Sequence, residues 1–180
     1  MRKILLLLAV QLLVLSGCAS GPTIVANTMA GTDFGAYKTY GFFQPLGTDR
    51  SNGVRTPLSS RLMASMEREM KARGLTSSDT PDLLIDFNVS AEDRVQVRTT
   101  PNMSPTIHRS HWSRRYSVWP TYSTTVRQYT EGSLIIDLVD NKAAALVAEG
   151  AATSRISSTD FTQQQIDDVV SQIMGDVWEN

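Results

Sequence analysis

The stretch EGSLIIDLVDNKAAALVAEGAATS, residues 131–154, decides the fold class because it predicts two neighbouring strands. Leu134, Ile136 and Leu138 recur at every second position, which is the period of a strand whose two faces differ. The next polar residues, DNK, predict a turn, after which residues 143–152 run back. The stretch therefore predicts an antiparallel hairpin in a sheet with one buried face.

Upstream segments add strands to this sheet. Pro81 begins a segment in which Leu83, Ile85, Phe87 and Val89 point one way. Aromatic and β-branched residues in YKTYGFF, residues 37–43, predict another strand, and a short one is possible at residues 23–27.

Two amphipathic helices complete the predicted fold. Thr56 offers an N-cap, Pro57 suits the first helical position, and Gly74 supplies the stop. Thr162 and Gln165 form a capping-box pattern before the last helix. Apolar residues recur at helical spacing in both segments: Leu58, Leu62, Met66 and Met70 in the first, and Ile166, Val169, Val170, Ile173, Met174 and Val177 in the second. We expect an α+β two-layer sandwich, with a mostly antiparallel sheet and both helices on one face.

Several of these segments resemble a known family. DFGAYKTYGFF (33–43), ARGL, PDLLIDF (81–87) and YTEGSLIIDLVDNKAAALVAEGAA (129–152) resemble, in order, the DUF4136 domain of bacterial lipoproteins. The resemblance implies a small α+β periplasmic domain. The family has no assigned activity, so the resemblance implies no catalytic residue.

The N-terminal residues predict export and attachment to a membrane. Two basic residues precede the apolar run of residues 4–15, which is shorter than the roughly 20 residues of a membrane-spanning helix and is typical of a signal peptide. LSGC, residues 15–18, resembles the lipobox of bacterial lipoproteins, which implies cleavage before Cys18 and acylation of that cysteine. The alternative is an ordinary signal peptide that leaves a free thiol at Cys18.

The residues after the cysteine predict which membrane holds the protein. Ala19 and Ser20, with no aspartate, imply the periplasmic face of the outer membrane in a Gram-negative lipoprotein. The formal net charge of −1 does not favour a nucleic-acid binder. The expected organisation is a signal peptide (1–17), a lipidated N-terminus and tether (18–32), and a single domain (33–180) with an insertion at about 94–127.

Candidates for catalysis are few. Asp86 and Asp137 lie mid-strand on the less apolar face, where paired carboxylates would suit a periplasmic hydrolase. The alternative is an acid that is solvated or that binds a loop. His108 and His111 are the only histidines, and zinc almost always needs four ligands, so we predict no metal site and no cofactor.

Residues 94–127 form the most unusual segment. It contains six arginines and no acidic residue in a chain that is acidic overall. As a loop it would be long enough to suggest function, and arginine and aromatic residues are enriched at binding hot spots. Candidate partners are lipid headgroups, an anionic glycan or an envelope protein. The alternative is that Val95, Val97 and residues 124–129 extend the sheet as strands. The candidate binding residues are Arg109, Trp112, Arg114, Arg115, Tyr116 and Trp119.

Overall fold

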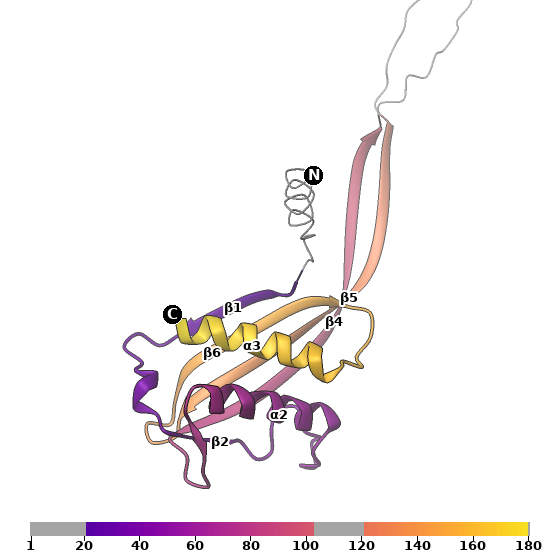
Figure 1. Ribbon diagram of the computed structural model, residues 1–180. Coiled ribbons are helices and arrows are strands. Elements are labelled where there is room, and N and C mark those ends of the chain that lie inside the picture. Colours follow the sequence, from indigo (N-terminus) through magenta and orange to yellow (C-terminus); the bar gives the residue numbers. More distant parts are fainter. Residues whose placement is uncertain (1–20, 103–120, 180) are drawn as a thin grey trace, which may run out of the picture.

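The computed structural model describes residues 21–102 and 121–179. They form one six-stranded sheet, ordered β1-β6-β5-β4-β2-β3, with both long helices packed on the same face (Figure 1). Only β2 pairs in parallel, with β3 and β4. The predicted α+β sandwich is thus confirmed. The strands are β1 (Thr23–Thr28), β2 (Thr39–Phe42), β3 (Thr76–Ser77), β4 (Leu83–Asn102), β5 (Thr121–Asp140) and β6 (Ala145–Ile156), and the helices are η1 (Phe34–Ala36), α2 (Pro57–Ala72) and α3 (Gln163–Glu179).

The predicted hairpin is present as β5 and β6. Its turn is longer than three residues, because Ala144 also belongs to it and adopts a positive φ of 50°. The Asp140 carboxylate accepts the backbone N–H groups of Lys142 and Ala143, at 2.9 and 2.8 Å. These two bonds replace the ladder bonds that the turn gives up.

The sheet begins closer to the N-terminus than expected. β1 pairs antiparallel with β6, from Thr23 opposite Thr153 to Thr28 opposite Ala148. The short strand considered possible at residues 23–27 is therefore part of the sheet. The tether predicted for residues 18–32 ends in the sheet at Thr23, and its first residues lie outside the described part of the chain.

Both predicted helices begin as their capping residues indicate. Thr56 accepts the Ser59 N–H at 3.0 Å, ahead of Pro57. At the second helix, Gln165 Oε1 accepts the Thr162 N–H at 2.9 Å, and Thr162 Oγ1 accepts the Gln165 N–H at 3.3 Å. This reciprocal pair is the predicted capping box, which satisfies N–H groups that the first turn leaves free.

The core lies between the sheet and the two helices. The apolar positions that alternate along the central strands point into it. Both helices contribute their predicted stripe. The largest fully buried side chains are Tyr40, Leu62, Met66, Met70, Leu83, Ile85, Phe87, Ile136, Leu138, Val170, Ile173 and Met174.

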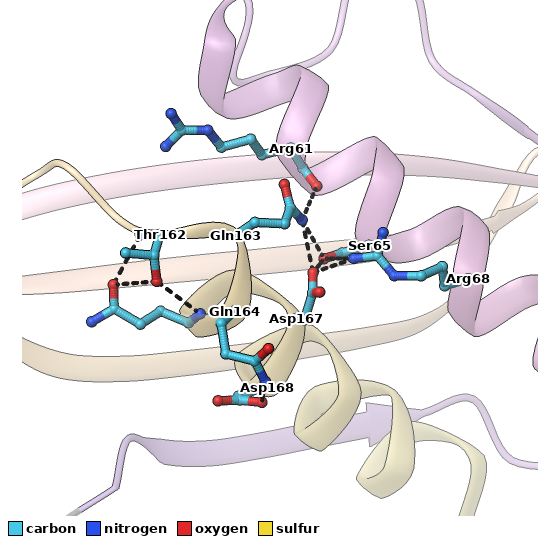
Figure 2. Close-up of polar contacts among 9 residues, drawn as sticks. Arg61, Ser65, Arg68, Thr162, Gln163, Gln164, Asp167 and Asp168 are labelled. Carbon is cyan, nitrogen blue, oxygen red and sulfur yellow. Dashed lines mark hydrogen bonds and ion pairs between the residues drawn. The ribbon is translucent and has the colours of Figure 1, made fainter.

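A polar cluster joins α2 to α3 beside this core (Figure 2). Asp167 accepts hydrogen bonds from Ser65 Oγ, from Arg68 Nη2 and, at 2.7 Å, from Gln163 Nε2. These donors, Ser65 foremost, hold the pKa of the Asp167 carboxyl below its usual value. The cluster satisfies the buried Ser65 hydroxyl and sets how the two helices face each other.

Candidate functional site

β4 and β5 continue beyond the body of the protein as a two-stranded arm (Figure 1). The arm comprises residues 91–102 of β4 and 121–132 of β5, paired without interruption to Asn102 opposite Thr121. β6 ends at Ile156, opposite Thr130, so the neighbouring strand covers only the arm's base. Among the described residues, no helix packs on the arm.

The arm corrects the reading of residues 94–127 as a loop. Residues 94–102 and 121–127 are strand, as the alternative of an extended sheet predicted. The side chains proposed for binding and attachment lie outside the described residues, as do both histidines: Cys18, His108, Arg109, His111, Trp112, Arg114, Arg115, Tyr116 and Trp119.

The strand pairing gives the arm one basic face. Arg94 is opposite Tyr129, Gln96 opposite Arg127, and Arg98 opposite Thr125, and partners in a ladder share a face. This face continues the open side of the sheet, away from the helices. Sequence reasoning identified the arginines but could not assign them to one face, because the face depends on the register.

Charges along this face change from paired to unpaired toward the tip. Near the base, Arg94 Nη2 lies 3.0 Å from Glu92 and 3.7 Å from Glu131. The Arg155 guanidinium lies 4.1 Å from the centre of the Tyr129 ring, a cation–π contact. Both arginines are thereby engaged within the protein, and neither is free for a ligand.

Arg98 and Arg127 lie further out and line a shallow pocket with Gln96 and Thr125. They are diagonal neighbours in the ladder, a separation that long side chains bridge. Within the described part of the chain, neither guanidinium forms an ion pair. Two like charges held side by side attract an anion, and guanidinium matches phosphate and carboxylate in shape.

The opposite face of the arm is more apolar than the basic face, although Asp93, Thr99, Thr124 and Gln128 also lie on it. Val95, Val97, Tyr122 and Val126 share the face that faces the helices in the body, and all four are more than half exposed. The arm is therefore amphipathic, with a basic side and a more apolar side.

The predicted carboxylate pair is present in the sheet, and one of its members binds a loop. Asp86 and Asp137 are direct partners in the ladder, and Glu149 extends the row onto β6. Asp86 Oδ1 accepts the N–H groups of Gly47 and Phe87, both at 2.8 Å. Asp86 thus binds a loop, as the non-catalytic alternative predicted.

Asp137 has a less favourable environment. Its Oδ2 accepts a 3.3 Å bond from Asn88, while its Oδ1 is buried without a partner among the described residues. Burial, then Glu149 and Asp86, raise the pKa of the Asp137 carboxyl. A carboxylate with a raised pKa costs stability at every pH where it is ionised.

Asp137→Asn should therefore stabilise the protein at pH 7, by about 1 kcal/mol, because the amide carries no charge to desolvate. The gain should shrink as the pH falls below the folded-state pKa and vanish below the unfolded value of about 3.9, where Asp137 is neutral in both states. Urea titrations at several pH values measure this. Asp168→Asn, at an exposed carboxylate, is the control; a loss of stability in Asp137→Asn at pH 7 would contradict the prediction.

Comparison with known proteins gives the family. The model of DUF4136, a domain of unknown function, matches residues 25–176. The chain belongs to the DUF4136 family. A search of curated proteins finds no match for this DUF4136 domain.

Two solved structures are similar to it. The first is a PDZ domain protein from Parabacteroides distasonis, with a TM-score of 0.50 and 18% identity. The match covers 83% of the DUF4136 chain and 34% of that protein, so this chain spans about a third of its length. The second is the PelC L103M dodecamer from Paraburkholderia phytofirmans, with a TM-score of 0.43, 9% identity, and coverage of 87% and 93%. At this identity the first likeness concerns the fold alone.

Two further observations concern the described residues. None of the helices in residues 21–102 and 121–179 is long and apolar enough to cross a membrane. In the same ranges, no group of three His, Cys, Asp or Glu side chains could hold a metal ion.

Proposed function

We propose that this DUF4136 domain is a lipid-anchored, non-enzymatic binding module on the periplasmic face of the outer membrane. Cys18 carries the anchor, and the basic face of the arm binds an anionic component of the cell envelope. The observation that supports this most is that Arg98 and Arg127, on a projecting ribbon, form no ion pair with any described residue.

The chemistry of this face suits an anion with several oxygens. Each guanidinium offers parallel N–H donors that match phosphate or carboxylate, while Gln96 and Thr125 supply neutral hydrogen-bonding groups. Lipid headgroups, anionic glycans and acidic protein surfaces share this chemistry. The segment 103–120, which connects the two strands, adds Arg109, Arg114 and Arg115 to the basic character, with Trp112, Tyr116 and Trp119 interleaved.

The anchor determines what the arm meets. Each buried methylene contributes about 0.8 kcal/mol, so one acyl chain anchors marginally and several on one cysteine anchor durably. Three chains on Cys18 would keep the domain at the membrane surface. The arm would then sample envelope components within a short range of that surface.

Crosslinking in intact cells, followed by identification of the captured species, tests this proposal. We expect Arg98→Ala/Arg127→Ala to lower capture of an anionic partner by about a hundredfold or more, since each charge-assisted bond contributes roughly 1.5–3 kcal/mol and two are lost. Arg50→Ala/Arg55→Ala removes two exposed loop arginines and serves as the matched control.

Mass spectrometry of the mature N-terminus in the same cells tests the anchor, with a triacylated Cys18 as the expected species. An unmodified Cys18 would refute the anchoring. Equal capture by the arm variant and its control would refute the binding face.

A further inference from the structure

We propose that the arm docks on the surface of the bilayer through its apolar face. The proposal rests on the proposed function for the position of the anchor at Cys18. It adds a second contact with the membrane, made by residues of β4 and β5, and so assigns a partner to the face opposite Arg98 and Arg127.

The docking face carries three adjacent valines and, beyond the polar pair Thr99 and Thr124, the ring of Tyr122. Val97 and Val126 are direct partners, Val95 precedes them on the same face, and Tyr122 follows toward the tip. Their exposed fractions are 58% for Val95, 62% for Val97, 60% for Val126 and 67% for Tyr122. Exposed apolar residues scattered singly need no explanation, but three adjacent exposed valines on a projecting element indicate a contact surface.

The docking face is an extension of the core face. Phe87 and Ile136, which are fully buried beneath the helices, point to the same side of the same two strands. An isolated two-stranded ribbon is marginally stable in water and needs packing on one face. The described residues supply no such packing beyond the base of the arm, and the proposal assigns it to the membrane surface.

The tether brings the membrane within reach of the docking face. Cys18 precedes Thr23 by five residues, which span at most about 18 Å. Thr23 lies in one cross-strand row with Thr153 and Ser133, at the end of the body where the arm begins. Two strand spacings add about 10 Å, so the acylated residue lies within about 30 Å of the arm's base.

The arm itself is about 35 Å long, from Glu92 to Asn102, which exceeds that distance. It also leaves the body at the end where the tether enters. A membrane that holds Cys18 is therefore within reach of the arm. A partner that is not at the membrane would have to fit between the arm and the membrane surface.

The charged side chains and the backbone groups of the arm determine how deeply it enters the bilayer. The acidic residues of the arm, Glu92, Asp93 and Glu131, lie at its base, whereas Arg98 and Arg127 lie further out, and each basic side chain near an anionic surface contributes about 1 kcal/mol. Both edges of the arm have unpaired backbone groups, which cannot enter the hydrocarbon region. The arm thus lies at the boundary between the headgroups and the acyl chains. The valines point toward the acyl chains, Tyr122 lies at the interface, and the arginines lie in the hydrated headgroup layer.

Neighbouring residues on opposite faces allow a direct test. Cys18 is the only cysteine, so the mature chain with Cys18→Ser accepts a single label. An environment-sensitive fluorophore is placed at Val97→Cys, on the apolar face, or at Gln96→Cys, on the basic face. The probes are vesicles of phosphatidylglycerol and phosphatidylethanolamine, with pure phosphatidylcholine as the neutral comparison.

We expect the label at position 97 to shift to the blue and to be quenched by spin-labelled acyl chains, while the label at position 96 remains in water. Neutral vesicles should produce a weaker response, because the arginines then contribute nothing. No response at position 97, or a response at position 96 alone, would overturn the proposal.

Unlabelled variants provide the second measurement. Val95→Asp/Val126→Asp should weaken co-sedimentation with the anionic vesicles about tenfold. Val25→Asp/Val54→Asp, at body valines of similar exposure (53% and 52%), should bind as the parent does.

If the arm variant changes the oligomeric state in analytical ultracentrifugation but not vesicle binding, the docking face is an interface between copies and the proposal fails. The chain in these assays lacks the anchor. Their outcome is therefore independent of whether Cys18 is acylated, which mass spectrometry tests separately.

Discussion

Gly150→Ala is expected to lower the free energy of unfolding by about 3 kcal/mol, the upper end of the usual cost of overpacking. A Cβ at Gly150 would lie 2.3 Å from Ile173 Cγ2 and 2.9 Å from Val177 Cγ2. Both contacts are to β-branched side chains on α3 that are fully buried. Neither can move without displacing the helix from the sheet, so the strain is retained.

Urea unfolding of three variants tests this explanation. Gly132→Ala is the control, because its Cβ would meet the end of Ile156, a partly exposed side chain that can rotate away; we expect a loss below about 1 kcal/mol. Combining Gly150→Ala with Ile173→Ala should cost less than the sum of the two, since the second change removes the clashing methyl group. Strict additivity would show that the contact with α3 is not the cause.

Phe87→Ala is expected to cost about 3–5 kcal/mol, the range for deleting a buried aromatic ring. Phe87 is fully buried in the part of β4 that lies in the body, where its ring lies 5.9 Å from that of Phe42. The rigid strands on either side of it prevent collapse of the cavity. A loss of this size would leave a domain of ordinary stability largely unfolded.

Val89→Ala is the matched control, because Val89 is the next residue on the same face of the same strand and is 46% exposed. We expect it to cost less than about 1 kcal/mol. The two substitutions together locate the end of the core, one side-chain position from the start of the arm. Equal losses in thermal or urea unfolding would mean that the arm's face is covered in solution.

The arm explains why the proposed function is assigned to an edge of the fold and not to a cavity. The core between sheet and helices is filled by side chains, and the conspicuous carboxylate Asp86 anchors the loop at Gly47. Among the described residues, four of the nine exposed large apolar side chains lie on β4 and β5 beyond the body, together with Arg98 and Arg127. The proposed anchor at Cys18, five residues before β1, would place both faces of the arm near a membrane.

Local signals in the sequence predicted the helices and the hairpin correctly. Thr56, Pro57 and Gly74 determine where α2 begins and ends through contacts within one turn, and Thr162 with Gln165 does the same for α3. These interactions involve residues close in the chain, so the sequence alone reveals them. The alternation in residues 134–138 likewise needs no distant partner to indicate a strand.

The candidate site was predicted only in part. Alternation placed Asp86 and Asp137 on the same face, but their direct pairing depends on the register of β4 with β5. The role of Asp86 depends on Gly47, which lies 39 residues away and has no sequence signal for this contact. The residues most typical of binding, Arg109 to Trp119, remain a prediction, since they lie outside the described residues.

By itself, the sequence determined the fold class, the limits of the helices and the concentration of arginine between residues 94 and 127. The tertiary structure decided that residues 94–102 pair with residues 121–129, and hence that Val97 and Arg98 lie on opposite faces. Hydrophobic periodicity depends only on residues that are close to one another in the chain. Which residues of two strands share a face of the sheet depends on the register between strands that are distant in the sequence. That pairing turns a basic segment into an arm with arginines on one face and exposed valines on the other.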